Sequence, residues 1–175
     1  GLTMFVADAD AVAAAEIPLD VYYPERVYDV TIDDLHLPAA SVLGSVDDGL
    51  AQLLPTLNLE RVAIAACSWG AGRSTLDAAV ERAREREVWS EPIGAHQAIQ
   101  HPLADAHADL EVARLALREA AWELDRGADS RGSTANVANL KACEAAWNAC
   151  EAAMTTFGGS SVGRRSGVAA AWGFV

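Results

Sequence analysis

The spacing of apolar residues divides the chain into an early part with strand-like patterns and a later part with helical ones. In residues 26–32 apolar and polar side chains nearly alternate, which predicts a strand with one solvent-exposed face. Two other short β-branched or aromatic runs, at 3–7 and 21–23, precede it, and prolines interrupt the stretch. About three strands are too few to close a sheet of their own. We therefore interpret residues 1–48 as the tail of a β-domain.

From residue 59 onward the apolar period becomes helical. Apolar side chains recur at steps of three and four in three long segments, each typical of the buried face of an amphipathic helix, and only Arg73 interrupts them. Short connections at 88–95 and 127–133 predict an antiparallel packing, so the fold class is mainly α: three long antiparallel helices of a four-helix bundle. The three stripes are Leu59, Val62, Ala66, Trp69, Leu76, Val80 and Ala83; Ile99, Leu103, Ala106, Leu110, Ala113, Leu117, Ala120 and Leu124; and Val137, Leu140, Cys143, Trp147, Cys150, Met154 and Phe157.

The periodicity ends after the third helix. The run Gly158–Ser161 terminates that helix, and residues 162–175 show no clear period. Three helices leave the place of a fourth open and expose an apolar strip. Unless the tail from Val162 folds back over this strip, we expect the chain to self-associate or to pair with a partner.

Charge and composition exclude several classes of protein. Thirteen Lys and Arg against 25 Asp and Glu give a formal charge of −12, which argues against a nucleic-acid or anionic-membrane surface. Residues 1–58 hold ten acidic side chains against one basic, whereas residues 59–175 hold fifteen against twelve. Alanine accounts for 37 of the 175 residues, as in close-packed helices. No apolar run reaches about 18 residues and no signal-peptide pattern occurs, so we expect a soluble, cytoplasmic protein.

Histidine and cysteine spacing does not favour a metal site. His96, His101 and His107 are five and six positions apart, which does not place them on one helix face in metal-binding register, so we expect solvated or singly hydrogen-bonded histidines. Cys143 and Cys150 lie seven positions apart on the third stripe. Small thiols commonly pack in cores, and we favour that interpretation over a redox or metal role.

Three polar or glycine-rich runs remain as candidates for chemistry. Residues 158–165 loosely resemble a phosphate loop, but they follow a helix and carry arginines at the Lys and Ser/Thr positions. They are better interpreted as a helix C-cap whose bare backbone can approach a ligand. Glu60-Arg61 is either a first-turn acid favoured by the helix dipole with a solvated arginine beside it, or a functional pair. The run Arg82–Glu87 is typical of a solvated face.

Several segments, taken in order, resemble the acyl-CoA dehydrogenase family. The most specific is Ala83-Arg84-Glu85-Arg86-Glu87-Val88-Trp89, followed by Pro92-Ile93-Gly94 and Gln97, which is similar to the family signature A-x-x-R-x-x-F-G-x-P-I-x-x-x-Q. The resemblance spans residues 1–159. Its other segments are 35–44, 59–61, 65–70, 103–105, 113–114, 120–122 and 153–159.

The resemblance implies a domain organisation. The family has an N-terminal helical domain, a middle β-domain and a C-terminal four-helix bundle. Residues 1–48 would be the tail of the middle β-domain, and residues 49–175 the C-terminal bundle without its last helix. The acidic loop that normally follows Phe-Gly-Gly is also missing, because residues 160–167 contain no acid.

The resemblance also assigns roles to individual residues. Arg165 stands where many members keep their catalytic glutamate, but a minority carry the base on the first bundle helix, immediately before an arginine. Glu60 is then the implied catalytic base, and Arg61 the residue that holds the substrate or supports this helix end. The implied contacts to FAD, shared with a neighbouring subunit, come from Arg86, Trp89, Gln97, Gly158 and Gly159; Val88 lacks a hydroxyl that some members use there.

The activity implied by the resemblance is α,β-dehydrogenation of an acyl-CoA thioester. A carboxylate removes the α-proton while the β-hydrogen leaves as hydride to flavin N5. The implied partners are the acyl-CoA substrate, an electron-transfer acceptor protein and further subunits in a homo- or hetero-oligomer, a dimer or tetramer. The alternative belongs to another class: a truncated or degenerate, non-catalytic oligomerisation module or partner subunit. A yellow chromophore in the purified protein favours the enzyme, and a colourless helical oligomer favours the module.

Overall fold

The computed structural model describes residues 1–12, 16–20, 26–127 and 132–175. The strand expected at 21–23 lies outside these residues. Contacts divide the chain into two compact units, residues 1–57 and 58–175, which are described separately. The division falls inside the long helix α2 (Gly49–Glu85), ten residues of which precede the helical period that begins at Leu59. The first part of α2 was not predicted from the sequence, because this segment contains Pro55 and has no regular apolar stripe.

The first unit consists of two short antiparallel strand pairs. Strand β1 (Met4–Phe5) pairs with β4 (Val42–Leu43), and β2 (Glu16–Pro18) pairs with β3 (Tyr28–Val30). The helical turns α1 (Ala9–Val12) and η2 (Ala39–Ser41) lie between them in sequence. The alternation around β3 predicts one covered face, but all three residues of β3 are exposed. Among the described residues of this unit only Gly49 is buried, because a ladder of two strands has no second layer to cover it.

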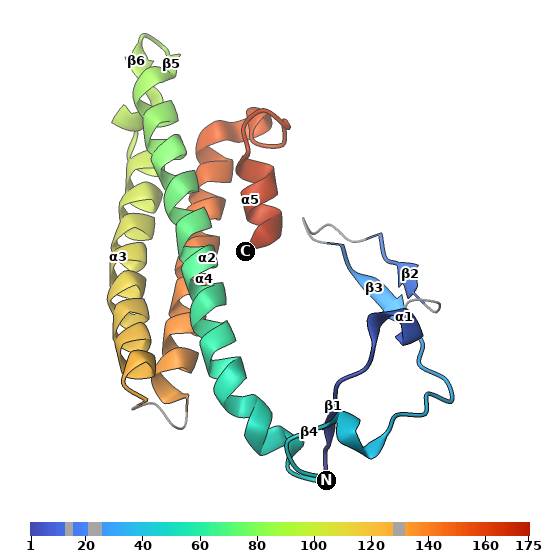
Figure 1. The fold of residues 1–175 in the computed structure, drawn as a ribbon. Coiled ribbons are helices and arrows are strands. Elements are labelled where there is room, and N and C mark those ends of the chain that lie inside the picture. Colours follow the sequence, from blue (N-terminus) through green and yellow to red (C-terminus); the bar gives the residue numbers. More distant parts are fainter. Residues whose placement is uncertain (13–15, 21–25, 128–131) are drawn as a thin grey trace. The chain divides into compact units, whose positions relative to one another are not determined.

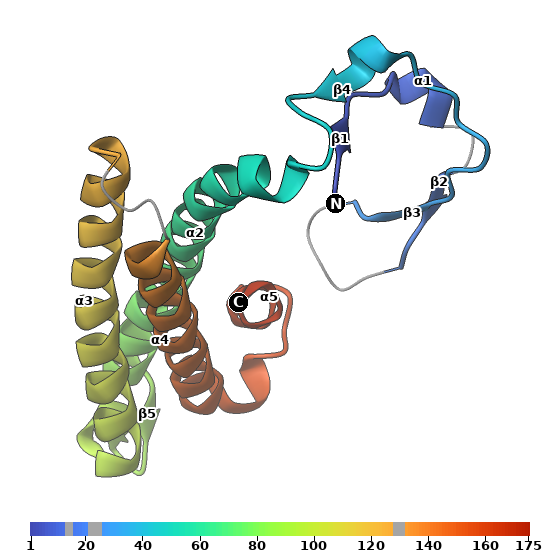
Figure 2. The same cartoon turned by 90° about the horizontal axis from the view of Figure 1, so that it is seen from below.

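The second unit is a bundle of long helices. The part of α2 from residue 58, α3 (Gln97–Asp125) and α4 (Ser133–Phe157) lie side by side with alternating direction, as Figure 1 and Figure 2 show. The expected mainly α fold is therefore confirmed. A hairpin of β5 (Glu87–Val88) and β6 (Glu91–Pro92) and the turn η3 (Ile93–Ala95) connect α2 to α3. No helix of the described residues is both long and apolar enough to cross a bilayer.

The apolar stripe of α3 packs as its sequence predicts. Its members Leu103, Ala106, Leu110, Ala113 and Ala120 are buried. The indole nitrogen of Trp69 on α2 donates a hydrogen bond to the Leu110 carbonyl oxygen at 2.9 Å and ties the two helices together. The one interruption in the α2 stripe is also explained, because the Arg73 guanidinium forms ion pairs with Asp77 (3.1 Å) and with Glu111 of α3 (3.5 Å).

The stripe expected on α4 is wrong in its first half, whereas Cys150 is buried and Met154 and Phe157 pack against the core. Its large members Val137, Leu140 and Trp147 are exposed, and on α2 the stripe residues Leu59 and Ala66 are exposed as well. Helices that carry small residues approach closely, and α4 therefore buries its small side chains while the bulky ones face outward. The buried face of α4 consists of Ala135, Ala138, Ala142, Ala145, Ala146, Ala149, Cys150, Ala152, Ala153 and Thr156.

Gly72 lies where α2 packs tightly against α4. A Cβ atom built at Gly72 would lie 2.6 Å from Ala146 Cα, a backbone atom that has little freedom to move. Gly70, two residues earlier on the same helix, has no atom within 4 Å of such a Cβ. The close packing of these two helices therefore depends on one glycine and not on the other.

We expect opposite stability changes when these two glycines are replaced with alanine. Gly70→Ala should stabilise the protein by about 0.5–1 kcal/mol, because alanine loses less backbone entropy in a helix. Gly72→Ala should destabilise it by about 1–3 kcal/mol, since the added methyl overpacks the contact with Ala146. Urea denaturation of both variants beside the parent measures the two changes, and equal effects would contradict this packing.

The C-terminal tail folds back onto α4. A turn, η4 (Gly158–Ser160), leads to the short helix α5 (Val168–Phe174), in which Val168 is buried. The ring of Trp172 packs against that of Trp147 with centroids 5.3 Å apart, and its indole nitrogen donates a hydrogen bond to a Glu151 carboxylate oxygen at 2.6 Å. The tail thus covers part of the strip that we expected to be open, while Val137 and Leu140 stay exposed.

Candidate functional site

The predicted site residues of the second unit form two groups that lie far apart along α2. Glu60 and Arg61 lie near the beginning of this unit, whereas Arg86 directly follows the last residue of α2. At 1.5 Å per residue, Glu60 and Arg86 are roughly 39 Å apart along the helix axis. The structure places Arg86 at the base of the hairpin, and it does not bring Glu60 to that end of α2.

The first group combines an exposed carboxylate with an anchored arginine. An Arg61 Nη nitrogen donates a hydrogen bond to Asn58 Oδ1 at 2.8 Å, and Asn58 is only 5% exposed. Gly132, just before α4, lies so close to Asn58 that any side chain at Gly132 would overlap its amide group. Asn58 therefore fixes the guanidinium of Arg61, the residue after Glu60, a role that could not be detected from the sequence.

Glu60 is not a first-turn acid. Helix α2 begins at Gly49, its first turn carries no acidic residue, and Glu60 lies three turns further on. The interpretation of Glu60 as a helix-dipole partner is wrong for this reason. Glu60 is exposed, and within the described part of the chain no ion pair reaches its carboxylate.

The second group surrounds the β5–β6 hairpin. Trp89 and Ser90 form its two-residue turn with positive φ angles of 52° and 68°, a backbone conformation that usually calls for Asn or Gly. Trp89 is 87% exposed at the tip, and its ring meets the His96 ring edge-on with centroids 6.3 Å apart. Non-glycine residues in this conformation store strain, which is typical of functional sites. The hairpin went undetected in the sequence because neither turn residue signals it.

Arg86 connects helix and hairpin through its backbone. Its amide nitrogen donates to the Arg82 carbonyl oxygen at 2.9 Å, which continues the helical pattern for one residue, and its carbonyl oxygen accepts from Ile93 at 2.8 Å. The Arg86 side chain is exposed, as is Gln97, the first residue of α3. Both side chains are therefore held at defined places on the surface and are free to meet a ligand.

Gly158 and Gly159 follow α4 at the same end of the bundle. Gly158 has φ 57° and ψ −138°, a conformation that side-chain-bearing residues rarely adopt. A Cβ at either glycine would meet no atom within 4 Å, so the backbone faces open space. This agrees with the interpretation of the run as a C-cap that a ligand can approach.

Arg82 has surroundings that the sequence analysis did not anticipate. Arg84 fits the expected solvated face, because its side chain is 75% exposed and forms a 4.0 Å ion pair with Glu81. Arg82 does not, since its Nε atom is buried and has no hydrogen-bond partner among the described residues. Its guanidinium carbon lies 5.7 Å from the centre of the Phe157 ring. One indication of this was available in the sequence, because residues 82 and 86 are four positions apart and therefore lie on the same face of a helix.

Of the two cysteines expected in the core, Cys150 is buried and Cys143 is only partly buried. Cys150 is fully buried, and burial raises the pKa of its thiol despite a hydrogen bond with Thr75 that acts in the opposite direction. A thiol with a raised pKa is a poor nucleophile and a poor metal ligand. Among the described residues no three side chains of His, Cys, Asp or Glu gather in a metal-binding arrangement.

Comparison with known proteins identifies the family. A family model described as the acyl-CoA dehydrogenase C-terminal domain matches residues 47–174. The chain belongs to the acyl-CoA dehydrogenase family. Acyl-CoA dehydrogenase FadE12 of Mycobacterium tuberculosis is 40% identical over 170 residues, which covers 95% of this chain and 44% of the relative. The chain therefore spans less than half the length of this curated acyl-CoA dehydrogenase.

Solved structures of acyl-CoA dehydrogenases have the same fold. A glutaryl-coenzyme A dehydrogenase in complex with glutaryl-CoA matches with a TM-score of 0.92 and 27% identity, over 99% of this chain and 45% of that one. Butyryl-CoA dehydrogenase from Megasphaera elsdenii shares the fold at 24% identity, with a TM-score of 0.88 over 98% of this chain and 45% of that one.

Acyl-CoA dehydrogenases form a family of FAD-dependent oxidoreductases, and FAD carries a diphosphate. The residues at the hairpin end fit that group. Arg82 has a buried nitrogen donor without a partner, Arg86 offers an exposed guanidinium, and the backbone at Gly158 and Gly159 is open. Guanidinium groups match phosphate oxygens in both charge and geometry.

Proposed function

We propose that this chain provides the C-terminal helical part of an FAD-dependent acyl-CoA dehydrogenase that introduces an α,β double bond into an acyl-CoA thioester. The observation that carries the proposal is the pair Glu60 and Arg61. An exposed carboxylate directly precedes, in the sequence of α2, an arginine that a buried asparagine, Asn58, holds in place. A base must approach the substrate freely, whereas the group that orients the substrate must be held still.

In the proposed reaction Glu60 accepts the proton from the acyl α-carbon. Arg61 orients the thioester substrate beside it or supports this part of α2. FAD, when bound, supplies the acceptor for the β-hydride and passes two electrons on to an acceptor protein. The substrate would thus lose two hydrogens: the α-hydrogen as a proton to Glu60 and the β-hydrogen as a hydride to the cofactor. The product would carry a double bond between these two carbons.

The separation of the two groups along α2 favours a cofactor shared between subunits. A distance of roughly 39 Å is longer than a single dinucleotide spans. Glu60 of one protomer and Arg86 of the same protomer therefore serve two different flavin molecules. On this proposal Arg86 and the turn Gly158–Gly159 contact the diphosphate of the flavin in a neighbouring subunit, while Trp89 and Gln97 lie along that cofactor.

A hybrid protein tests the proposal. This chain replaces the aligned 170-residue segment of FadE12, so that the remaining parts of the enzyme come from the relative. We expect the purified hybrid to retain a yellow flavin that is bleached when an acyl-CoA is added without oxygen. A hybrid that folds and binds flavin but is not bleached by any acyl-CoA would contradict the proposed activity.

Replacement of Arg86 with alanine should weaken FAD binding. Loss of a charge-assisted contact to the diphosphate costs about 1.5–3 kcal/mol, which corresponds to roughly a 10- to 150-fold lower affinity. Calorimetric titration of the flavin-free hybrid with FAD measures the change, with Arg84→Ala as the control because Arg84 forms an ion pair with Glu81. An unchanged affinity in the Arg86 variant would remove this residue from the cofactor site.

A second function is favoured by one specific observation. The large side chains Val137 and Leu140 of α4 are exposed. On the alternative proposal the chain is a non-catalytic oligomerisation module or partner subunit that uses this apolar face. A colourless oligomer that neither binds FAD nor supports bleaching in the hybrid would favour the module.

A further inference from the structure

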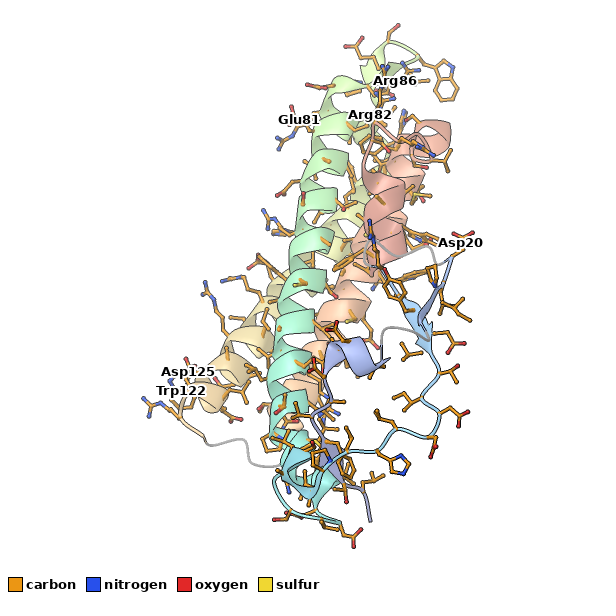
Figure 3. The ribbon with its side chains drawn as sticks, turned by 45° about the vertical axis from the view of Figure 1, so that its right-hand side comes forward. Asp20, Glu81, Arg82, Arg86, Trp122 and Asp125 are labelled. Carbon is orange, nitrogen blue, oxygen red and sulfur yellow. The ribbon has the colours of Figure 1, made fainter. Side chains whose placement is uncertain are left out.

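The β5–β6 hairpin is held only weakly by its own backbone. Each strand has two residues, and Pro92 of β6 has no amide hydrogen to donate to the ladder. Trp89 and Ser90 form the turn with positive φ angles, which residues other than glycine adopt at a cost in free energy. Figure 3 shows Arg86 at the end of α2, where the hairpin begins. The position of the turn therefore depends on contacts that its side chains make with other elements.

His96 provides such a contact from the beginning of α3. Its carbonyl oxygen accepts hydrogen bonds from the amide nitrogens of Ile99 (2.9 Å) and Gln100 (3.0 Å), so its backbone belongs to the first turn of this long helix. Its ring meets the Trp89 ring at an angle of 79°, with the centroids 6.3 Å apart. Aromatic rings favour this edge-to-face arrangement at such distances. His96 thus connects the tip of the hairpin to a helix of the bundle.

The same ring contains a polar atom without a hydrogen bond. The Nε2 atom of His96 is buried, and nothing in the part of the chain that the structure describes bonds to it. The His96 side chain makes no cap hydrogen bond to α3 either. Glu91 Oε1 lies 3.7 Å from Nε2, which is too far for a hydrogen bond but close enough for an ion pair. A proton on His96 therefore gives the buried nitrogen a charged partner across a short gap.

Glu91 is the charged group that favours this proton. The titratable or charged side chains on the elements next to His96 are Arg82, Glu85 and Arg86 at the end of α2, Glu87 and Glu91 of the hairpin, and His101 of α3. Among the described residues, Glu91 is the one that forms an ion pair with His96. The positive end of the α3 dipole opposes a charge on His96, and the carboxylate of Glu91 acts against that opposition.

We propose that His96 is a positioning residue for Trp89, and that a proton on His96 strengthens its hold on the hairpin through Glu91. The inference rests on the proposed function, in which Trp89 lies along the cofactor. Histidine side chains exchange their proton between about pH 5 and pH 8, where carboxylates stay ionised. The ion pair therefore forms as the pH falls through this range and is lost as the pH rises. At the lower pH the hairpin presents Trp89 to the cofactor in one place.

Nuclear magnetic resonance of the purified chain between about pH 5 and pH 8 tests this coupling. The indole Nε1–H signal of Trp89 and the ring Cε1–H signal of His96 report on the two side chains separately. We expect both signals to change with one common midpoint. Glu91→Gln keeps the shape of the side chain but removes its charge, so it should lower the midpoint of the His96 signal by about half a pH unit or more. The change at Trp89 should move with it.

His96→Phe distinguishes the effect of the proton from that of the ring. Phenylalanine keeps an aromatic contact with Trp89 but takes up no proton, so the Trp89 signal should stay constant over the same pH range. A purely structural role of His96 does not predict this loss of pH dependence. Circular dichroism establishes that each variant is folded.

His36 and Asp34 provide a matched control in the same chain. His36 Nδ1 lies 3.7 Å from Asp34 Oδ1, which is the separation found between His96 and Glu91, but both side chains of the control pair are 88% exposed. Asp34→Asn should therefore leave the signals of Trp89 and His96 unchanged. A change at Trp89 in this variant would show that the signal responds to charge in general, and would overturn the inference.

The remaining outcomes separate this inference from the proposed function. A Trp89 signal that keeps its pH dependence in the His96→Phe variant would show that another group controls the hairpin. An unchanged His96 midpoint in the Glu91→Gln variant would exclude the ion pair. Neither measurement involves a flavin, so both results leave the proposed dehydrogenation untouched. Conversely, a hybrid that is not bleached by acyl-CoA contradicts the dehydrogenation while the coupling of His96 to Trp89 stands.

Discussion

Replacement of Glu60 with glutamine is expected to lower the rate of α,β-dehydrogenation at least about 100-fold while FAD binding persists. Glutamine keeps the shape and hydrogen-bonding capacity of the side chain but cannot accept the α-proton, and a positioned general base contributes about 10²–10⁴-fold to such a step. In residues 59–159 no other acid is next to the arginine that the resemblance places at the substrate. Anaerobic flavin bleaching by acyl-CoA in the FadE12 hybrid measures the rate.

The control for this variant is Glu119→Gln, which changes an exposed carboxylate of α3 and should leave the bleaching rate unchanged. Because Glu60 lies far from the first turn of α2, the substitution should alter stability by less than about 0.5 kcal/mol. A loss of activity in the Glu60 variant would therefore result from the missing base and not from unfolding. Wild-type bleaching by the Glu60 variant would exclude this residue as the base, and an inactive parent hybrid would favour the non-catalytic module.

Replacement of Leu110 with alanine should destabilise the helical unit by about 2–5 kcal/mol. Leu110 is fully buried in the middle of α3, and its Cδ2 atom would lie 3.3 Å from a Cβ built at Gly72. Three closely packed helices leave little scope for the cavity to collapse, so most of the lost contact is not regained. Thermal unfolding should show a midpoint lower by roughly 10 °C or more.

Leu115→Ala is the matched control because it removes the same atoms from the same helix at a position that is 61% exposed. Its effect on the free energy of unfolding should stay within about 0.5 kcal/mol in dilute solution. A large effect of this control would show that Leu115 is covered in an oligomer. Equal small effects of both variants would contradict the packing of α3 against α2.

The helical part of the fold was predictable where large and small residues separate clearly. On α3 the apolar positions recur without interruption and contrast with charged neighbours, so periodicity alone identified the buried residues Leu103 and Leu110. On α4 alanines occupy several faces, and the pattern pointed to Val137 and Leu140, which are exposed. Alanine differs little in hydrophobicity from its neighbours, so the sequence does not show which face of α4 is buried. The distance between the packed helices decides it.

The candidate site was predictable in part. The resemblance singled out Arg86, Trp89 and the two glycines, and the structure brings the ends of α2 and α4 together through Arg82 and Phe157. Arg82 itself was interpreted as solvated because it belongs to a run of charged residues. Burial of a single guanidinium nitrogen depends on the ring across from it, which lies 75 positions later in the chain.

The sequence by itself determined that the chain is mainly helical, which residues of α3 face the core, and that the segment from Ala83 to Gln97 resembles an acyl-CoA dehydrogenase signature. These features depend on local periodicity or on residue identity, which the sequence displays directly. Only the tertiary structure decided that Gly72 packs tightly against Ala146 of α4, that Asn58 anchors Arg61, and that Arg82 Nε has no partner among the described residues. Each of these depends on side chains that are distant in sequence and meet only when the helices pack.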